Sequence, residues 1–392
     1  YVWLSQGLAS LARMGGQVHV AQCLGRGDKE QAHRYAKTAV QLSILLGLAF
    51  AVVSLLFTDP LVAFFKLEGA KTILDAKIYM RITCGLILFS FLNLTLTGLY
   101  TAQGDSKTPF VANFIGLLIN LLLDPLLILG VGPFPRIEVA GAAVATVSAQ
   151  LVVMLVMMVG VFRSKKEENV LKGIRLFEPF SKEELGNICK IGGPTAIQGM
   201  VYCMISMVLT RMVAAFGAEA IATQRVGGQI ESVSWNTADG FAAALNAFVG
   251  QNYGAKKMDR VQKGYRISFW TVAIWGALIM LAFIIFPGPI AGVFFHEEKA
   301  MEIAISYLII IGFSEAFMCV ELMTIGALSG LGKTKLCSVI SITATSMRIP
   351  LAMVLSRTSL GLDGIWWALT LTSVAKGIIF YLTFRYQMRE KC

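Results

Sequence analysis

The chain has 392 residues, of which 56% are hydrophobic and only 15% are charged, and its mean hydropathy is +0.68. A soluble domain has roughly 45–50% apolar and 25% charged residues, so this composition excludes an ordinary soluble domain. The net charge of +10 would suit a nucleic-acid partner, and the positions of the basic residues test that interpretation.

Apolar segments long enough to cross a bilayer recur from one end of the chain to the other. Eleven such segments are separated by short polar or basic stretches. They lie near residues 2–22, 36–57, 78–99, 110–131, 139–162, 187–215, 219–249, 265–286, 302–328, 336–356 and 364–386. This pattern predicts an all-α polytopic membrane protein.

Lys and Arg residues are concentrated in alternate loops between these segments. One set of loops carries 21 of them, and the opposite set carries 6. Because positively charged loops mark the cytoplasmic side, the basic balance reflects topology and argues against nucleic acid as a partner. We expect a multi-pass protein surrounded by lipid in the plasma membrane, the inner membrane in a bacterium, with a cytoplasmic C-terminus.

The chain repeats itself at a nearly constant offset. The hinge sequence around Gln251 and Gly254 has a counterpart around Gln22 and Gly25, 229 residues earlier, and each glycine is predicted to cap a long helix. Further glycine and lysine matches follow at an offset of 228. Both hinges fall on the predicted cytoplasmic side, so the halves are parallel repeats, which in transporters enclose a central cavity.

Two lobes of six helices each follow from this repeat. The sequence predicts an N-terminal lobe over residues 1–162, a cytoplasmic linker over 163–185 and a C-terminal lobe over 186–392. Projecting the second half back by 229 residues leaves one helix without a counterpart, so we expect the first helix to be missing from this sequence. The complete protein would then have twelve spans, of which eleven are present.

Asn120 and Asp124 lie four residues apart in the fourth apolar segment, on one face of a helix. An ionisable group within a span costs several kcal/mol unless it is paired or hydrated, so Asp124 is a candidate functional residue. The alternative is local, because Asp124 precedes Pro125 and could repair a backbone that the proline kinks.

Glu231, Trp235 and Asp239 form a stripe at positions i, i+4 and i+8 in the second half. A carboxylate–indole–carboxylate stripe can hold a lipophilic cation by charge and by cation–π attraction. The alternative is a polar seam between helices, in which the acids pair with basic residues of the same half. The basic candidates are Arg211, Arg225, Arg348 and Lys376.

Glu315 and Glu321 are six residues apart and therefore cannot share a helix face. Glu321 lies deeper in its span and is the favoured cavity residue of the two. Arg348 precedes Pro350 and aligns with Asn120 at an offset of 228, so the two halves have opposite chemistry at one equivalent place. We expect Arg348 to be a counter-ion for an acid of the C-terminal lobe.

Five stretches carry a further signal as an ordered set. They are the hinge VGQNYGAKKMDR at 249–260, the turns TAQGDSKTP at 101–109 and SGLGKTK at 329–335, and the segments NLLLDP at 120–125 and VAGAAVAT at 139–146. Together they resemble the multidrug and toxic compound extrusion (MATE) family over essentially the whole chain. The resemblance implies a transporter rather than an enzyme. Such a transporter exports amphipathic, usually cationic organic compounds in exchange for Na+ or H+, by rocker-switch alternating access.

The resemblance also implies a coupling site in the first lobe. In this family an N-x-x-x-D pair binds the cation together with a Thr of the sixth helix and an Asp of the first. Asn120 and Asp124 would therefore hold Na+ or H+, with Thr146 supplying a hydroxyl and the first-helix Asp lying outside this sequence. No other metal or cofactor is expected, and we expect a monomer.

In the second lobe the sequence departs from the family. Many relatives carry an acid on the seventh helix, and the segment 187–215 has none. This departure moves the expected site to Glu231, Asp239 and Glu321, beside Trp235.

A related alternative is a flippase for lipid-linked saccharide precursors, since the wider superfamily contains such proteins. A cavity for a diphosphate should be strongly cationic, whereas acids balance the basic residues within these spans. An ATP-binding loop is excluded because SGLGKT lacks the spacing of a Walker motif. The three histidines are scattered along the chain, which argues against a metal centre or a Ser/His/Asp enzyme.

Overall fold

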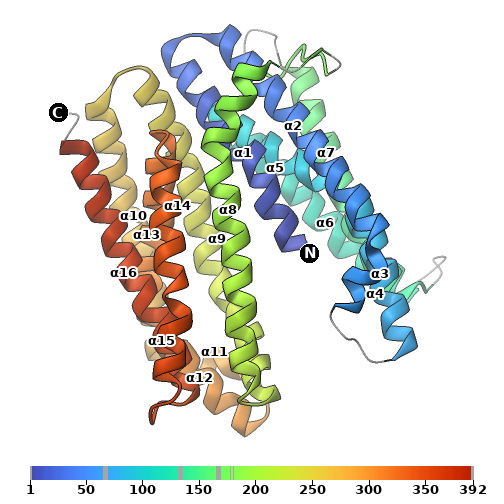
Figure 1. The fold of residues 1–392 in the computed structure, drawn as a ribbon, viewed down its shortest axis with the longest axis vertical. Coiled ribbons are helices and arrows are strands. Elements are labelled where there is room, and N and C mark those ends of the chain that lie inside the picture. Colours follow the sequence, from blue (N-terminus) through green and yellow to red (C-terminus); the bar gives the residue numbers. More distant parts are fainter. Residues whose placement is uncertain are drawn as a thin grey trace. The chain divides into compact units, whose positions relative to one another are not determined.

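The computed structural model describes residues 2–64, 69–130, 136–164, 169–176, 178–179 and 181–389. Within these ranges every regular element is a helix, and the chain divides into two compact units, Tyr1–Ala196 and Ile197–Cys392. We call them the N-terminal unit and the C-terminal unit. Figure 1 shows the helices in chain order from blue to red.

Each unit is a helical bundle. In its described residues the N-terminal unit comprises α1 (Val2–Arg26), α2 (Lys29–Leu56), α3 (Thr58–Ala63), α4 (Ala70–Gly85), α5 (Leu88–Ala102), α6 (Lys107–Leu129), α7 (Glu138–Arg163) and the start of α8 (Lys182–Ala214). The C-terminal unit comprises the rest of α8, α9 (Ala218–Gly254), α10 (Met258–Ile285), α11 (Pro287–Gly292), α12 (Glu298–Gly312), α13 (Glu315–Gly330), α14 (Thr334–Ser346), α15 (Arg348–Leu355) and α16 (Leu362–Arg389).

The eleven apolar segments predicted from the sequence are helical where they are described. By length and apolar composition, seven spans qualify alone, with α14 and α15 counted as one, and α4 with α5 and α12 with α13 qualify as pairs bent by 43° and 51°. The other two, α1 and α9, are 25 and 37 residues long but more polar. The prediction of a multi-pass α-helical membrane protein is confirmed.

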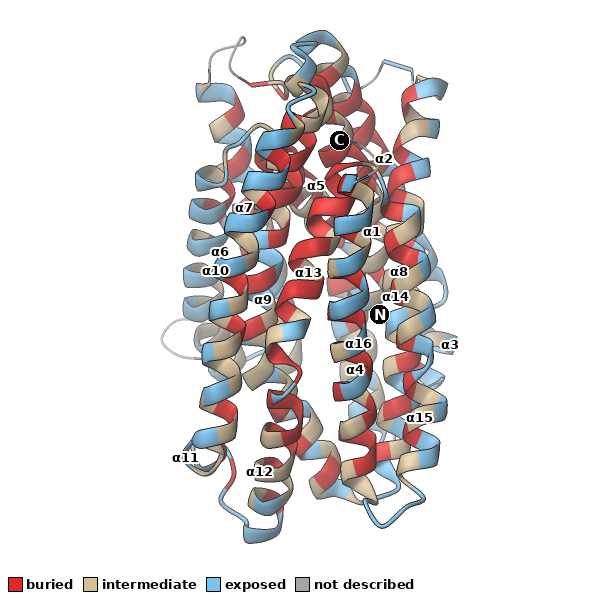
Figure 2. Cartoon of the chain, turned by 90° about the vertical axis from the view of Figure 1, so that its left-hand side faces the viewer, coloured by how far each residue is buried: buried red, intermediate tan, exposed pale blue. Residues whose placement is uncertain are grey.

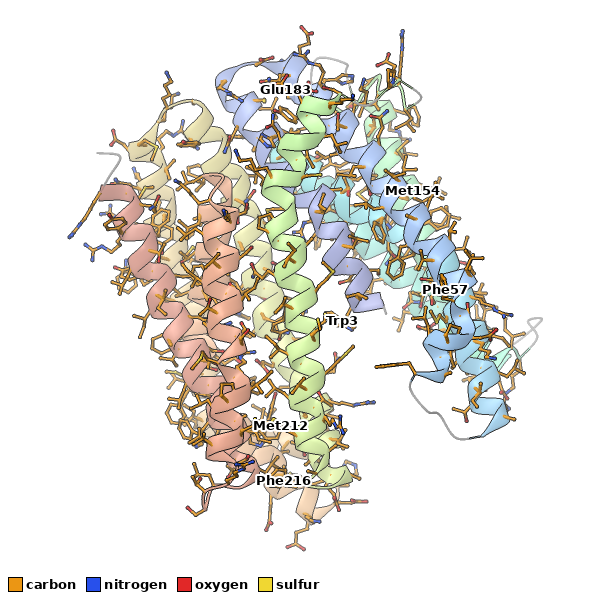
Figure 3. The ribbon with its side chains drawn as sticks, in the orientation of Figure 1. Trp3, Phe57, Met154, Glu183, Met212 and Phe216 are labelled. Carbon is orange, nitrogen blue, oxygen red and sulfur yellow. The ribbon has the colours of Figure 1, made fainter. Side chains whose placement is uncertain are left out.

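The outer faces of the long helices are apolar, as a lipid environment requires. On α6, the exposed fractions of Phe110, Leu117 and Leu121 are 62–69%. Phe57 and Phe216 are further examples of exposed aromatic side chains (Figure 3). Figure 2 shows exposed and buried faces alternating along the same helices. Leaving such surface in water would cost roughly 25 cal/mol per Å², so lipid is its natural solvent.

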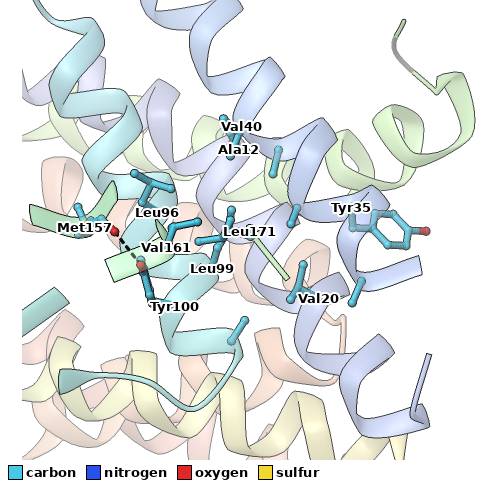
Figure 4. Close-up of a cluster of buried hydrophobic side chains, with 14 of the residues drawn as sticks. Ala12, Val20, Tyr35, Val40, Leu96, Leu99, Tyr100, Met157, Val161 and Leu171 are labelled. Carbon is cyan, nitrogen blue, oxygen red and sulfur yellow. Dashed lines mark hydrogen bonds between the residues drawn. The ribbon is translucent and has the colours of Figure 1, made fainter. Parts of the chain in front are cut away.

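The core of the N-terminal unit is centred on α5 (Figure 4). Leu99 and Tyr100 of this helix belong to one buried cluster with Val20 of α1 and Met157 of α7. The Tyr100 hydroxyl donates to the Met157 carbonyl at 2.7 Å, which satisfies the one polar atom that the ring brings into the core.

The turns that follow α1 and α9 have the same geometry. Gly27 and Lys256, 229 residues apart, both have positive φ, at 82° and 59°. In each turn the N–H groups of this residue and the next donate to carbonyls three and five residues earlier, which is a Schellman cap. The prediction that Gly25 and Gly254 form these caps is wrong by two residues, because both lie within their helices.

Two matched glycines mark helix crossings. Gly98 of α5 faces Arg13 of α1, and Gly326 of α13 faces the Ala242 carbonyl of α9. A Cβ atom at either glycine would overlap its neighbour, so the small residue permits the close approach. The same helix pair is thus packed in the same way in each unit, as a repeat predicts.

The segment after α7 is bound to the N-terminal unit. Gln41 of α2 donates to the carbonyls of Leu176 and Glu178 at 2.8 and 2.7 Å. Gln103, which follows α5, accepts from the Val170 N–H at 2.9 Å. Of the predicted linker 163–185, residues 165–168, 177 and 180 lie outside the described part.

Candidate functional site

Asn120 and Asp124 lie on one face of α6, as their spacing predicts. Asn120 Nδ2 donates to Asp124 Oδ1 at 3.5 Å, and both residues are half-buried. The helix continues through Pro125, which removes the donor for the Leu121 carbonyl. An ionised carboxylate only accepts hydrogen bonds, so the Asp124 side chain cannot satisfy that carbonyl. A protonated carboxyl could donate to it, so repair of the kink stays an alternative to the predicted coupling role.

Thr146 lies on α7, which packs against α6. A Cβ on Gly141 would lie 2.6 Å from the Leu127 carbonyl oxygen. Because the helices run antiparallel, this contact places Thr146 near the level of Asp124. The Thr146 side chain is exposed, and its hydroxyl donates to the Ala142 carbonyl at 2.9 Å. Its role as a cation ligand stays a prediction.

Asn93 and Gln150 add a polar contact that the sequence analysis missed. Asn93 of α5 is buried, and its amide nitrogen donates to the carbonyl and the side-chain oxygen of Gln150 at 2.7 and 2.8 Å. The Asn93 Oδ1 atom is buried without a partner. Gln150 lies one turn after Thr146 on α7, so this amide pair is next to the predicted site. The available signal was a lone Asn in the apolar stretch before Gly98.

The predicted stripe on α9 runs from a partly enclosed residue to an exposed one. Glu231 is half-buried, and its Oε2 atom accepts from the Tyr307 hydroxyl of α12 at 3.1 Å. Trp235 is half-buried one turn later, and Asp239 is exposed. The three residues lie along one helix, as predicted, but in surroundings of different polarity. Their attraction for a cation should therefore fall from Glu231 to Asp239.

Glu321 lies in a buried ion pair. Lys376 Nζ of α16 donates to Glu321 Oε1 of α13 at 2.8 Å, and both side chains are no more than 7% exposed. Its depth within the span predicts that Glu321 faces substrate. Its structural surroundings are those of a helix–helix contact, in which one acid and one base neutralise each other.

Arg348 begins α15 and is buried against α16. Its Nε atom donates to the Thr372 hydroxyl at 3.1 Å, and a terminal nitrogen donates to the Ser373 hydroxyl at 2.9 Å. The carboxylate of Glu231 lies within electrostatic range. Arg348 therefore has hydroxyl groups as its hydrogen-bond partners, and it acts on an acid through space.

Glu315 is the acid that the sequence analysis ranked below Glu321. It is the first residue of α13, directly after the break with α12, and it is fully buried. Neither of its carboxylate oxygens has a hydrogen-bond partner. The sequence favours Glu321 over Glu315 because Glu321 lies deeper in its span. Depth does not show which acid has a partner on a neighbouring helix.

Comparison with known proteins assigns the chain to a family. The family model described as MatE matches residues 2–126 and 194–354, well over half of the chain. The chain is 27% identical over 379 residues to the probable multidrug resistance protein YoeA of Bacillus subtilis, covering 96% of this chain and 82% of the relative. It is 26% identical over 375 residues to an FAD transporter of Shewanella oneidensis, covering 94% and 80%.

The fold is similar to that of solved transporters. An outward-facing multidrug resistance MATE family transporter of the MOP superfamily has a TM-score of 0.90 and 22% identity, over 99% of this chain and 86% of that one. A MOP superfamily transporter from Pyrococcus furiosus, whose binding pocket is described as having reverse polarity, has the same TM-score, identity and coverage. With the family match over both units, the chain belongs to the MATE family of membrane transporters.

Proposed function

We propose that the protein is a secondary antiporter that exports amphipathic, mainly cationic organic compounds in exchange for Na+ or H+. The observation that carries the proposal is the Asn120–Asp124 pair within an apolar helix. A carboxylate in a span costs several kcal/mol unless a positive charge accompanies it. A coupling cation supplies that charge, and the Asn120 amide adds an oxygen ligand beside it.

The substrate class is inferred from relatives and from local charge. Several similar proteins are named for multidrug resistance or multidrug export, which supports small organic substrates. In the C-terminal unit, Glu231 accepts a hydrogen bond from the neutral Tyr307 hydroxyl, and Trp235 follows on the same helix face. This combination suits a lipophilic cation.

Coupling follows from differential affinity. A bound cation changes the balance between inward-open and outward-open states only if it binds one state more tightly. In the proposed rocker-switch cycle, Asp124 binds the cation in one state and releases it in the other. The export of the organic compound then follows the inward flow of the coupling cation.

A flippase for lipid-linked saccharide precursors remains the alternative function. Its substrate carries a diphosphate, which needs several cationic groups. In the described C-terminal unit Lys376 is already paired with Glu321, and Arg348 is held by two hydroxyl groups. Competition by a lipid diphosphate would separate the two functions, because it should block a flippase and leave export of a cationic dye unchanged.

The orientation in the membrane belongs to the same proposal. The excess of Lys and Arg in one set of loops supports a cytoplasmic C-terminus and a cytoplasmic linker. A protease added to inside-out vesicles should then cut the linker, and the same protease added to right-side-out vesicles should not.

The decisive experiment measures export of ethidium by proteoliposomes under an imposed Na+ or H+ gradient, each in turn. Asp124→Asn should reduce gradient-driven export to the level of empty liposomes. Asp59→Asn is the matched control, because Asp59 is an exposed acid whose partner is Lys77, at 2.7 Å. Undiminished export by the Asp124 variant would reject this residue as the coupling group, and wild-type export that ignores both gradients would reject antiport.

A further inference from the structure

The bent span formed by α12 and α13 has a glutamate at its break. α12 ends at Gly312, α13 begins at Glu315, and the two helices meet at 51°. The equivalent span of the N-terminal unit, α4 with α5, bends by 43°. The residue 228 positions before Glu315 is Ile87, which is also buried. A comparable bend forms with an apolar residue at this place, so the fold does not require the carboxyl group.

Among the described residues Glu315 has no ion-pair partner, and the Ser234 hydroxyl is the donor beside it. It is fully buried, and neither oxygen has a hydrogen-bond partner. A Cβ on Gly276 of α10 would lie 2.6 Å from the Ala316 Cα atom, so α10 closes over this turn. Ser234 of α9 lies beside Glu315, with its hydroxyl 3.3 Å from Cys319 Sγ. An ionised carboxylate is strongly unfavourable in such a place, whereas a protonated one is not.

The charges of the neighbouring helices lead to the same conclusion. Among the described residues close to this place, three buried or half-buried acids, Glu231, Glu315 and Glu321, accompany two buried bases, Arg348 and Lys376. Glu321 is paired with Lys376, and Arg348 acts on Glu231, which Tyr307 also stabilises. Glu315 is the acid left over, and it lies within electrostatic range of Glu231. One added positive charge makes this set of three acids and two bases electrically neutral.

A proton fits this site better than a metal ion. Within the described part of the chain, the titratable groups within electrostatic range of Glu315 are Glu231 on α9, Tyr307 on α12 and Cys319 on α13, and α10 brings Gly276. Farther away, Arg348 on α15 lies near Glu231, Lys376 on α16 is paired with Glu321, and Tyr202 on α8 lies near Tyr307. In the described residues, no three His, Cys, Asp or Glu side chains form a metal-binding group. Metal ions such as Na+ require several oxygen ligands at once.

We propose that Glu315 carries an exchangeable proton in the C-terminal unit, separate from the cation at Asp124. Ser234 and Glu231 on α9 are the polar groups beside the Glu315 carboxyl, and neither lies within hydrogen-bond distance of its oxygens in this structure. When a cationic compound binds beside Glu231, its charge replaces that of the proton. The proton then passes from the Glu315 oxygen to water and leaves a carboxylate, with no other bond broken. This step rests on the proposed function, because it makes the organic cation and the proton alternative occupants.

Infrared spectroscopy of the purified full chain tests the protonation directly, without a substrate. Near pH 7 surface carboxyl groups are ionised, so the carbonyl band of a protonated carboxylic acid reports a buried acid. We expect this band in the wild-type protein and a band weaker by one carboxyl group in Glu315→Gln. If that variant does not fold, Glu315→Ile supplies the side chain found at Ile87. A wild-type protein without the band, or a folded variant at either substitution whose band is as strong as in the wild type, overturns the proposal.

Two further measurements distinguish a proton on Glu315 from a cation at the proposed coupling site of the N-terminal unit. The band should persist in Asp124→Asn, and its loss there would assign the proton to Asp124 and overturn the role of Glu315. Exchange of K+ for Na+ at constant pH should leave the band unchanged, whereas its loss would show that Na+ occupies the site. None of these results would change the expected dependence of export on Asp124. The proposal for Glu315 can therefore fail while the proposed antiport function holds.

Discussion

Lys376 on α16 and Glu321 on α13 form an ion pair of 2.8 Å inside the C-terminal unit, with side chains 7% and 6% exposed. Such a pair has lost most of its hydration, and its mutual attraction compensates for that loss only while both partners are present. The pair therefore fixes how α13 lies against α16, and α13 is the helix that begins with Glu315.

Removing one partner of this pair should be strongly destabilising. Lys376→Met leaves the Glu321 charge buried and alone, for which we expect a loss of about 3–5 kcal/mol and a clearly lower melting temperature in detergent. The double variant Glu321→Leu/Lys376→Met removes both charges and should recover most of the loss.

The exposed pair Lys299–Glu219 is the matched control, at 3.2 Å with side chains 69% and 32% exposed. Lys299→Met should change stability by at most about 1 kcal/mol. A double variant of the buried pair that is no more stable than Lys376→Met would show that the two residues do not compensate each other.

Substitutions along the α9 stripe should affect cation binding in graded fashion. Glu231→Gln should weaken the binding of a permanently charged aromatic cation by about tenfold, which is about 1.4 kcal/mol, and leave an uncharged analogue nearly unaffected. Asp239→Asn should have a smaller effect, because an exposed carboxylate is screened by water. Equilibrium dye binding to the purified protein measures both, and equal losses for charged and uncharged ligands would instead indicate a purely structural seam.

The two Schellman turns should respond oppositely to glycine. Gly27→Ala forces a Cβ atom into left-handed backbone and should cost about 1 kcal/mol, although no atom lies within 4 Å of that Cβ position. Lys256→Gly relieves the same conformation and should leave stability unchanged or raise it by up to about 1 kcal/mol. Thermal unfolding of both variants measures the difference, and a loss at both positions would contradict the shared backbone geometry.

Attachment of the linker to α2 should depend on pH and on Gln41. The hydrogen bond from Lys37 to Glu178, 2.8 Å long, and the charge of that lysine lower the pKa of the Glu178 carboxyl below its usual value. Because the pKa in the attached state is the lower one, this contribution is present at neutral pH. It is lost as the pH falls through that value, below the ordinary glutamate pKa of about 4.3.

Limited proteolysis of the linker measures this attachment. Gln41→Ala removes both donated hydrogen bonds and should speed cleavage at neutral pH. Lys37→Ala should have a weaker effect there, because its pair is exposed, and should abolish the increase in cleavage on acidification. Equal cleavage of all three proteins at both pH values would show that these contacts do not hold the segment.

The sequence predicts local features well because they depend on spacing. Apolar segments, the face shared by Asn120 and Asp124, and the parallel repeat all follow from intervals along the chain. Each is a property of one helix or of a constant offset, so no tertiary information is needed. The helical spans were predicted in this way and confirmed. The family and its transport class were predicted from a resemblance in ordered motifs, and the family match confirms them.

Partnerships between distant segments could not be predicted in the same way. Lys376 lies 55 residues after Glu321, and it was one of four candidate basic partners, among which Arg348 was the expected counter-ion. Which acid has a partner depends on how α13 rotates against α9 and α16. For that reason Glu315 was ranked below Glu321.

The turn at Lys256 gives evidence of how the two halves of the chain are related. One copy of the turn has glycine and the other has lysine, yet both make the same two Schellman hydrogen bonds. The left-handed bend is therefore present in a copy that lacks the residue best suited to it. Main-chain shape can therefore record common descent at positions where an alignment of the two copies would find only a mismatch.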